Sequence, residues 1–419
     1  MPGHKGTEFL GCEALDITEI AGADVLYYAE GIIAESEDNV TALFGTAHSF
    51  YSTEGSTLAI KAMLTLAIGR SSEARPLVLA ARNVHKAFVY AAALLDFEVE
   101  WLYPEESSHL CACKITPAQL DAVLSSLGRK PCALYLTSPD YLGNIADIEG
   151  ISRVCKKHGV LLLVDNAHGA YLAFCSPSMH PISLGADICC DSAHKTLPVL
   201  TGGAYLHISK SAPCAEELCG EARRALSLFA STSPSYLILQ SLDICNRYIA
   251  DGYRQRLDDC IKRIERTKEK IKSLGAEVAP SEPLKLVIMQ GEALGAHLRK
   301  CGIEPEFCDG DVTVLMATPE NTAKDFEKLI SALESFTAKE QSNTSLPTVS
   351  PSRATLSIRD AIFAKQELID VRDAEGRICA SPTVSCPPAV PVAVSGEIIT
   401  KEMIEVCLHY GVEKISVVK

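Results

Sequence analysis

Apolar residues between positions 56 and 209 follow two spacings in alternation. Segments with apolar residues three or four positions apart predict amphipathic helices, and short unbroken apolar runs predict buried strands. The predicted helices are 56–68, 84–95, 117–127 and 148–158, and the predicted strands are 77–81, 99–103, 132–137, 160–164, 187–191 and 204–208. Because strands that alternate with helices form parallel sheets, we expect an α/β fold with a mostly parallel sheet covered by helices.

The pattern changes after Pro234. Apolar residues recur at helical spacing as far as Gly275, which predicts one long linking helix. The elements expected next are strands 286–289 and 312–316 and helices 293–300, 323–336 and 358–365. Residues 341–352 are rich in Ser, Thr, Asn and Pro and are a linker candidate, and a proline-rich stretch at Cys386-Pro387-Pro388 belongs to a tail. We therefore expect a large domain at 1–275, a small α/β domain at 276–340, and a linker and tail at 341–419.

The composition is that of a water-soluble globular protein. Of the 419 residues, 47% are hydrophobic and 22% are charged, and no run of eighteen apolar residues is present to cross a membrane. A net charge of −14, without a basic stripe interleaved with aromatic residues, argues against a nucleic-acid partner. The seventeen cysteines show no repeated C-x-x-C spacing, and the start of the chain carries no secretory signal. We therefore expect reduced thiols, a cytoplasmic location and no metal site.

Asp165 and Lys195 are the most informative pair of polar residues. Asp165 follows the apolar residues 161–164 at the carboxyl end of a predicted strand, the edge at which open α/β sheets bind ligands. A carboxylate buried there is costly unless a cation faces it. Lys195, just after strand 187–191, can bind an aldehyde cofactor as a Schiff base while Asp165 keeps the cofactor's ring nitrogen protonated. The pair therefore predicts a pyridoxal phosphate site, although each residue alone is more often a surface lysine or a helix cap.

Further candidate residues are predicted at the same edge. Gly55-Ser56-Thr57 begins an apolar helix and offers backbone N–H groups and two hydroxyls to a phosphate, although helix capping is the commoner use of such residues. His85 follows strand 77–81, where a flat imidazole can stack on a cofactor ring or serve as an ordinary surface residue. The remaining candidates are Thr137 and Ser138, which close another strand, and Ser192 and His194, which flank the lysine.

These motifs resemble those of the Orn/Lys/Arg decarboxylase family, pyridoxal-phosphate enzymes of the aspartate-aminotransferase fold (fold type I). The motifs that fall in the family's order are Pro2-Gly3-His4-Lys5-Gly6, Gly55-Ser56-Thr57, Arg82-Asn83-Val84-His85-Lys86, Thr137-Ser138-Pro139-Asp140-Tyr141, Asp165-Asn166-Ala167-His168-Gly169 and Ser192-Ala193-His194-Lys195-Thr196-Leu197. The tail resembles the family through Pro387-Pro388, Pro391 and Gly396-Glu397-Ile398-Ile399. The resemblance spans most of the chain.

The resemblance implies decarboxylation of a basic amino acid (arginine, lysine or ornithine) to an amine and carbon dioxide, as in polyamine biosynthesis, with pyridoxal 5′-phosphate as cofactor. It implies that Lys195 is the Schiff-base lysine, Asp165 the partner of the ring nitrogen and His85 the stacking residue. The other cofactor contacts that it implies are Gly55, Ser56, Thr57, Ser138, His168, Ser192 and His194. It also implies a homodimer, or an oligomer built from dimers, with sites near the subunit boundary.

The chain departs from the family at several positions. Asn166 stands where the family usually has Glu, Tyr171 where it has His, and Glu54 where it has Asn. Family members also carry residues before the Pro-Gly-His-Lys motif, so we expect the start of this chain to be shortened. Two alternatives stay open at this point: an aminotransferase or another lyase on the same scaffold, and a catalytically silent regulatory subunit that keeps the fold.

Overall fold

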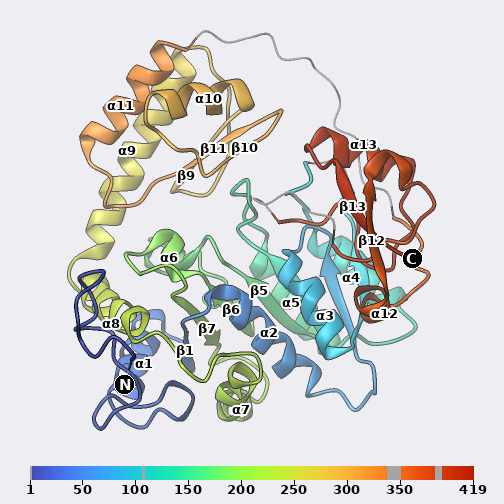
Figure 1. Cartoon of the computed structure of the whole chain (residues 1–419), viewed down its shortest axis with the longest axis horizontal. Helices are drawn as coiled ribbons and strands as arrows, with labels where there is room; N and C mark the ends of the chain where they lie inside the picture. The colour runs from blue at the N-terminus through green and yellow to red at the C-terminus, as the bar shows by residue number, and fades with distance from the viewer. Residues whose placement is uncertain (1, 106–108, 337–350, 383–388) are drawn as a thin grey trace. The chain divides into compact units, whose positions relative to one another are not determined.

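The structure is a computed structural model that describes residues 2–105, 109–336, 351–382 and 389–419 (Figure 1). Most of the predicted linker at 341–352, and the whole of the predicted Cys386-Pro387-Pro388 stretch, lie outside these described residues. Within the described ranges, no helix combines the length and the apolar character needed to cross a membrane.

Seven strands form the main sheet, in the spatial order β1-β7-β6-β5-β4-β2-β3. Their bounds are β1 His48–Ser52, β2 Leu77–Ala81, β3 Glu98–Leu102, β4 Ala133–Thr137, β5 Leu161–Asp165, β6 Ile188–Asp191 and β7 Ala204–Ile208. The pairs β2–β4, β4–β5 and β5–β6 are parallel, whereas β7 is antiparallel to both β6 and β1. The predicted α/β fold with a mostly parallel sheet is therefore confirmed, and the carboxyl ends of β1, β4, β5 and β6 meet at one edge of the sheet.

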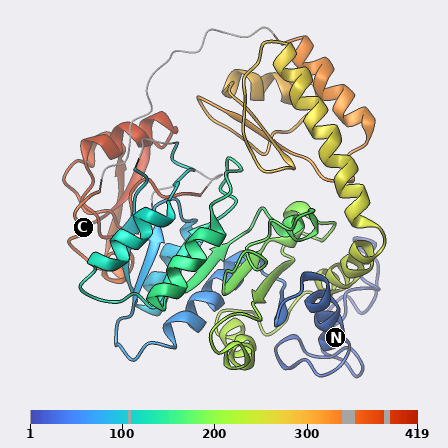
Figure 2. The same ribbon diagram turned by 180° about the vertical axis from the view of Figure 1, so that it is seen from behind.

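Burial on both faces explains why the apolar runs form strands. Every residue of β2, β5, β6 and β7 is buried, as expected for strands covered by helices on both sides. Helix α2 (Gly55–Ile68) packs against β5, β6 and β7 on one face of the sheet (Figure 1). Helices α4 (Pro117–Ser126) and α5 (Ile148–His158) lie together on the opposite face, which Figure 2 shows from behind.

The chain divides into two compact units. The first comprises Met1–Ala80, Thr116–Ser138 and Asp147–Arg254. Besides α2, α4, α5 and all strands of the main sheet except β3, which belongs to the second unit, it contains α1 (Ile32–Phe44), α6 (Ala193–Thr196), α7 (Ala215–Ser227), α8 (Tyr236–Ala250) and short 3₁₀ helices at Leu26–Tyr28 and Ala170–Phe174.

The second unit comprises Ala81–Ile115, Pro139–Ala146 and Gln255–Lys419. It contains a four-stranded sheet in the order β10-β11-β9-β8 and a two-stranded sheet of β12 and β13. The strand bounds are β8 Val278–Ala279, β9 Lys285–Ile288, β10 Phe307–Cys308, β11 Thr313–Met316, β12 Gln366–Asp370 and β13 Lys414–Val418. Its helices are α3 (Lys86–Leu95), most of α9 (Tyr253–Ser273), α10 (Glu292–Lys300), α11 (Ala323–Glu334), α12 (Ile358–Phe363), α13 (Lys401–His409) and a 3₁₀ helix at Val371–Asp373. The predicted domain boundaries at 275 and 340 stay predictions.

The predicted single linking helix is wrong in one respect. The segment forms two helices, α8 and α9, separated at Asp251 and Gly252. Gly252 adopts a left-handed backbone conformation with φ of 69°, which ends the ladder of hydrogen bonds in α8. Apolar residues continue at helical spacing on both sides of the break, so the hydrophobic pattern alone does not reveal it.

Asp187 lies at the amino end of β6 and leads to a prediction about pH. Its side chain is buried, Oδ2 accepts the N–H of Leu162 at 2.8 Å, and burial raises its pKa from 3.8 to about 6. Between these two values the folded protein keeps a proton that the unfolded chain releases, so the stability contributed by this group falls as the pH rises through 6. We expect the free energy of unfolding of the wild type, relative to Asp187→Asn, to fall by about 2 kcal/mol between pH 4 and pH 7 in urea titrations. A difference that does not vary with pH would contradict this reading of Asp187.

Candidate active site

Asp165 is the last residue of β5 and opens onto the carboxyl edge of the sheet. It is buried, with 2% of its surface exposed. The Tyr135 hydroxyl donates a hydrogen bond to Oδ2 at 3.0 Å, and the N–H of Ala167 donates to Oδ1 at 3.2 Å. Burial, and next the Asp165 carboxylate, raise the pKa of Tyr135 well above its usual value, so the phenol keeps its proton and stays a donor. The carboxylate is thus held in a fixed position at the edge where a ligand can reach it.

Lys195 lies on the short helix α6, which begins two residues after β6 ends. Its Nζ is 3.0 Å from Nε2 of His168, which follows Asp165 by three positions. Next to it, His194 donates its Nδ1–H to the Gly203 carbonyl at 3.0 Å. Burial, and then the Lys195 charge, lower the pKa of His194, while the bond to Gly203 opposes them. The predicted residues Asp165, His168 and Lys195 therefore belong to adjoining loops of one edge.

The amino end of α2 lies at this same edge. Gly55 begins the helix with φ of 71°, and its N–H donates to the Gly202 carbonyl at 2.7 Å. The Ser192 hydroxyl donates to the Ser56 hydroxyl at 2.8 Å, so two of the predicted phosphate contacts meet. Thr57 lies exposed in the first turn of the helix. A helix amino end with two hydroxyls beside it suits an anion.

The end of β4 is beside Asp165. Thr137 pairs with Asp165 in the strand register, and the N–H of Ser138 donates to the Asp165 carbonyl at 3.0 Å. The Thr137 hydroxyl oxygen is buried and has no hydrogen-bond partner among the described residues. Such an orphaned polar atom is unusual in a folded protein and is expected where a ligand completes the hydrogen bonding.

His85 belongs to the second unit. It is the N-cap residue of α3, and its Nδ1 accepts the N–H of Ala87 at 3.1 Å. The predicted stacking of its ring on a cofactor stays a prediction. Arg82, from the same predicted motif, donates to the carbonyls of Pro391 and Val392 at 2.8 and 2.9 Å and thereby anchors the tail within this unit.

The three positions at which the chain departs from the family are structurally distinct. Asn166 is fully buried, and its Nδ2 donates to Asp191 Oδ1 at 2.7 Å. Tyr171 is fully buried in the 3₁₀ helix that follows. Glu54 is exposed, and its Oε1 accepts the N–H of Ser231 at 2.7 Å.

Family models match two stretches of the chain. The model described as Orn/Lys/Arg decarboxylase, major domain, matches residues 3–290, and the model for the C-terminal domain of the same family matches residues 336–410. The chain belongs to the Orn/Lys/Arg decarboxylase family. This is a family of pyridoxal-phosphate-dependent enzymes of fold type I that decarboxylate basic amino acids.

Individual relatives and structures agree with the family assignment. The chain is 31% identical to the uncharacterized protein YaaO of Bacillus subtilis, over 97% of this chain and 89% of that protein. It is 29% identical to the arginine decarboxylase of the same organism, over 96% of this chain and 88% of the relative. The structure resembles the lysine decarboxylase LdcF of Francisella novicida with a TM-score of 0.83 and 17% identity, over 100% of this chain and 78% of that one. At that identity the likeness shows the fold alone.

Proposed function

We propose that this protein decarboxylates arginine, lysine or ornithine to the corresponding amine and carbon dioxide, with pyridoxal phosphate bound covalently at Lys195. The observation that carries the proposal is that a lysine amine and a buried carboxylate, Asp165, lie on adjoining loops at the carboxyl edge of one sheet. The cofactor dependence of the family supports it.

The residues at this edge fit the proposed cofactor. Ser56, Ser192 and the amino end of α2 offer donors to a phosphate, and Asp165 offers a carboxylate to a protonated ring nitrogen. A Cβ added to Gly55 would meet no atom within 4 Å, so there is open space beside this residue. The orphaned Thr137 hydroxyl offers one further polar contact.

In this proposal the Lys195 amine must lose a proton before it can bind the cofactor, and His168 is the group that receives it. An amine attacks an aldehyde only when it is uncharged, whereas a solvated lysine has a pKa near 10.4. Nε2 of His168, at 3.0 Å, is placed to take a proton from Nζ of Lys195, which leaves the amine uncharged and the imidazole protonated. Because His168 lies three residues after Asp165, this contact links the amine to the loop that follows β5.

Asp165 stabilises a proton on the ring nitrogen. An opposite charge nearby raises the pKa of a cationic nitrogen by about 1 to 3 units. The hydrogen bonds from Tyr135 and Ala167 hold the Asp165 side chain in a fixed position. When bound, pyridoxal phosphate supplies an electron sink for the electron pair that remains when the substrate's carboxyl carbon leaves as carbon dioxide. His85 is proposed as the residue that stacks on the ring.

The hydroxyl of Ser192 gives a prediction about cofactor affinity. Ser192→Ala removes the donor to Ser56 and one proposed phosphate contact, so we expect the apoprotein to bind pyridoxal phosphate about tenfold more weakly. Absorbance titration of the apoprotein measures this. Ser126→Ala, which removes an exposed hydroxyl at the end of α4, is the matched control and should leave the affinity unchanged. Equal affinity in Ser192→Ala and the wild type would remove Ser192 from the site.

Product analysis tests the proposed reaction. The holoprotein is incubated separately with arginine, lysine and ornithine carrying a labelled carboxyl carbon, and labelled gas and amine are measured. We expect labelled carbon dioxide and the corresponding amine from one of the three. A keto acid without carbon dioxide would indicate an aminotransferase, and no product with any substrate would indicate a silent subunit. A homodimeric state and a cytoplasmic location also stay predictions.

A further inference from the structure

Two groups of histidine and aspartate side chains lie close enough together to suggest a metal ion. Within the described part of the chain they are His109, Asp309 and Asp311 in the second unit, and His180, Asp191 and His207 in the first. In each group, the candidate ligand atoms lie within 4.8 Å of one another. Neither group contains a residue that the proposed mechanism uses.

The hydrogen positions on the rings argue against a metal in both groups. A histidine that binds a metal through Nε2 carries its hydrogen on Nδ1 and donates it to a neighbouring acceptor. Here the Nδ1 atoms of His109 and His180 instead accept backbone N–H groups, from Cys111 at 3.1 Å and from Ile182 at 3.3 Å. Nδ1 of each ring therefore carries no hydrogen, and the ring hydrogen is on Nε2, where it points at an aspartate.

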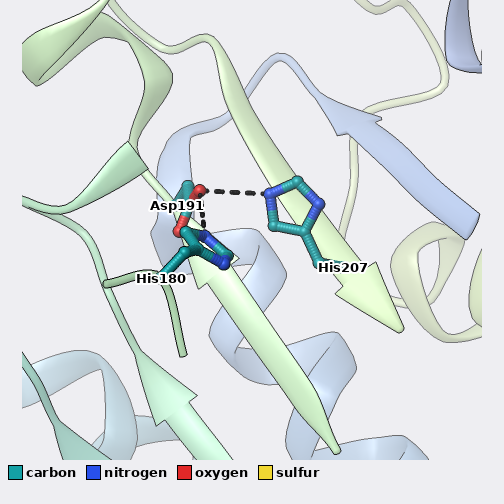
Figure 3. A group of neighbouring side chains, drawn as sticks. All are labelled: His180, Asp191 and His207. Carbon is teal, nitrogen blue, oxygen red and sulfur yellow. Dashed lines mark hydrogen bonds and ion pairs between the residues drawn. The ribbon is translucent and has the colours of Figure 1, made fainter. Parts of the chain in front are cut away.

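Asp191 is the centre of the buried group in the first unit (Figure 3). Its Oδ2 accepts hydrogen bonds from Nε2 of His180 at 3.0 Å and Nε2 of His207 at 3.1 Å, and its Oδ1 accepts from Nδ2 of Asn166 at 2.7 Å. No more than 1% of any of these four residues is exposed. We call His180, Asp191, His207 and Asn166 the Asp191 cluster.

The surroundings of the Asp191 cluster fix both imidazole rings. Ser49 Oγ lies 2.8 Å from Nδ1 of His207, and the Phe44 ring stacks on His207 with centroids 4.6 Å apart while meeting His180 edge-on at 5.5 Å. Burial lowers the pKa of His207, which keeps this ring neutral. Burial by itself would raise the pKa of Asp191, but His180 and His207 lower it well below its usual range. The cluster thus holds one buried negative charge surrounded by donors.

The Asp191 cluster connects the two loops that carry the proposed cofactor residues. Asn166 directly follows Asp165, and Asp191 directly precedes Ser192. The bond between Asn166 and Asp191 therefore joins residues 165–169 to residues 192–196. A Cβ on Gly169 would lie 2.0 Å from Asn166 Oδ1, so the first loop turns tightly over this side chain and allows no larger residue at 169.

We propose that Asp191 is a positioning residue. Its hydrogen bond to Asn166 fixes residues 165–169, which include Asp165, relative to residues 192–196, which include Lys195. A site whose groups are held in place before the ligand arrives avoids the ordering cost at binding, which raises affinity. The two histidines hold the carboxylate so that its Oδ1 faces Asn166. The identity of the ligand in this inference rests on the proposed function, whereas the connection between the loops does not.

Exchanging the two partners tests the hydrogen bond. Asp191→Asn puts an amide donor opposite the amide donor of Asn166, and Asn166→Asp puts two carboxylates opposite each other. The double variant Asn166→Asp/Asp191→Asn reverses the bond, because the amide at position 191 then donates to the carboxylate at position 166, while the amide oxygen still accepts from both histidines.

Asp187→Asn is the matched control, since it changes a buried carboxylate just before the other end of the same strand. If Asp191→Asn does not fold, Asn166→Ala removes the same bond and leaves Asp191 with its histidines.

Two readouts are measured on each protein. The first is the affinity of the apoprotein for pyridoxal phosphate, which we expect to fall about tenfold or more in each single variant and to recover to within about threefold in the double variant. The second is hydrogen–deuterium exchange of the apoprotein, which we expect to rise at 165–169 and 192–196 in the single variants alone. Asp187→Asn should change neither. A double variant that recovers neither readout, or an Asp191→Asn protein that matches the wild type in both, would overturn the proposal.

Two further outcomes are distinguishable from these. If the wild type takes up no pyridoxal phosphate while exchange still rises in the single variants, the proposed function fails and the positioning role stands. If the purified wild type contains one equivalent of a divalent metal that His207→Gln loses, the cluster is a metal site and the positioning role falls.

Discussion

Lys195→Ala is expected to abolish turnover, with a loss of about a thousandfold or more, because the amine that binds the cofactor covalently is removed. The variant should also lose the visible absorbance of the protein-bound cofactor. Carbon dioxide release and the absorption spectrum measure the two effects. Folding should be preserved, because the side chain of Lys195 is not part of the hydrophobic core. Its Nζ forms a hydrogen bond with His168 at the carboxyl edge of the sheet.

A surface lysine provides the control for this substitution. Lys210→Ala removes an exposed charge just beyond β7, and it should leave both turnover and the cofactor spectrum unchanged. Turnover by Lys195→Ala within a few fold of the wild type would show that another group holds the cofactor.

Asp165→Ala is expected to reduce turnover far more than cofactor binding. Without the carboxylate, the ring nitrogen loses the charge that keeps it protonated, and a change of about 1 to 3 pKa units corresponds to a loss in rate of about tenfold to a thousandfold. The affinity for pyridoxal phosphate should change little by comparison, because the proposed phosphate contacts, Ser56 and Ser192, remain. Steady-state rates at saturating cofactor, together with the affinity of the apoprotein, measure the two effects separately.

Asp165→Glu sharpens this comparison. It keeps the negative charge but moves it by one methylene, so it should retain more activity than Asp165→Ala. Full activity in Asp165→Ala would refute the assignment of Asp165 as the partner of the ring nitrogen. An equal loss in both variants would show that turnover depends on the exact position of the carboxylate and not on its charge alone.

The sequence predicts this edge of the sheet well because the edge depends on local patterns. Four consecutive apolar residues before Asp165 mark a strand buried on both faces, and the chain must leave such a strand at the edge of the sheet. The same argument places Lys195 after β6. Ser56 and Ser192 are separated by 136 positions in the chain, and their contact follows from the strand order, in which β1 and β6 both lie beside β7.

The residues that support the site were not predicted. Tyr135 lies in an apolar strand, and only the pairing of β4 with β5 brings its hydroxyl to Asp165. The Asp191 cluster gathers side chains from a loop, two antiparallel strands and the turn after β5, and no spacing in the sequence relates these four positions. Contacts of this kind depend on tertiary register, which a hydrophobic pattern does not contain.

The hydrophobic pattern of the sequence does not reveal the strands β12 and β13, for a different reason. Each residue of β12 is exposed or half-buried, so the strand lacks the unbroken apolar run that marks β5. A two-stranded sheet with one open face shows at most a weak alternation of polar and apolar residues, which a search for buried runs passes over.

Covalent trapping identifies the lysine that binds the cofactor. The wild-type protein is loaded with pyridoxal phosphate, reduced with sodium borohydride and digested, and the modified peptide is identified by mass spectrometry. We expect one reduced adduct, located on Lys195. An adduct on another lysine, or no adduct at all, would contradict the assignment of Lys195 as the Schiff-base lysine.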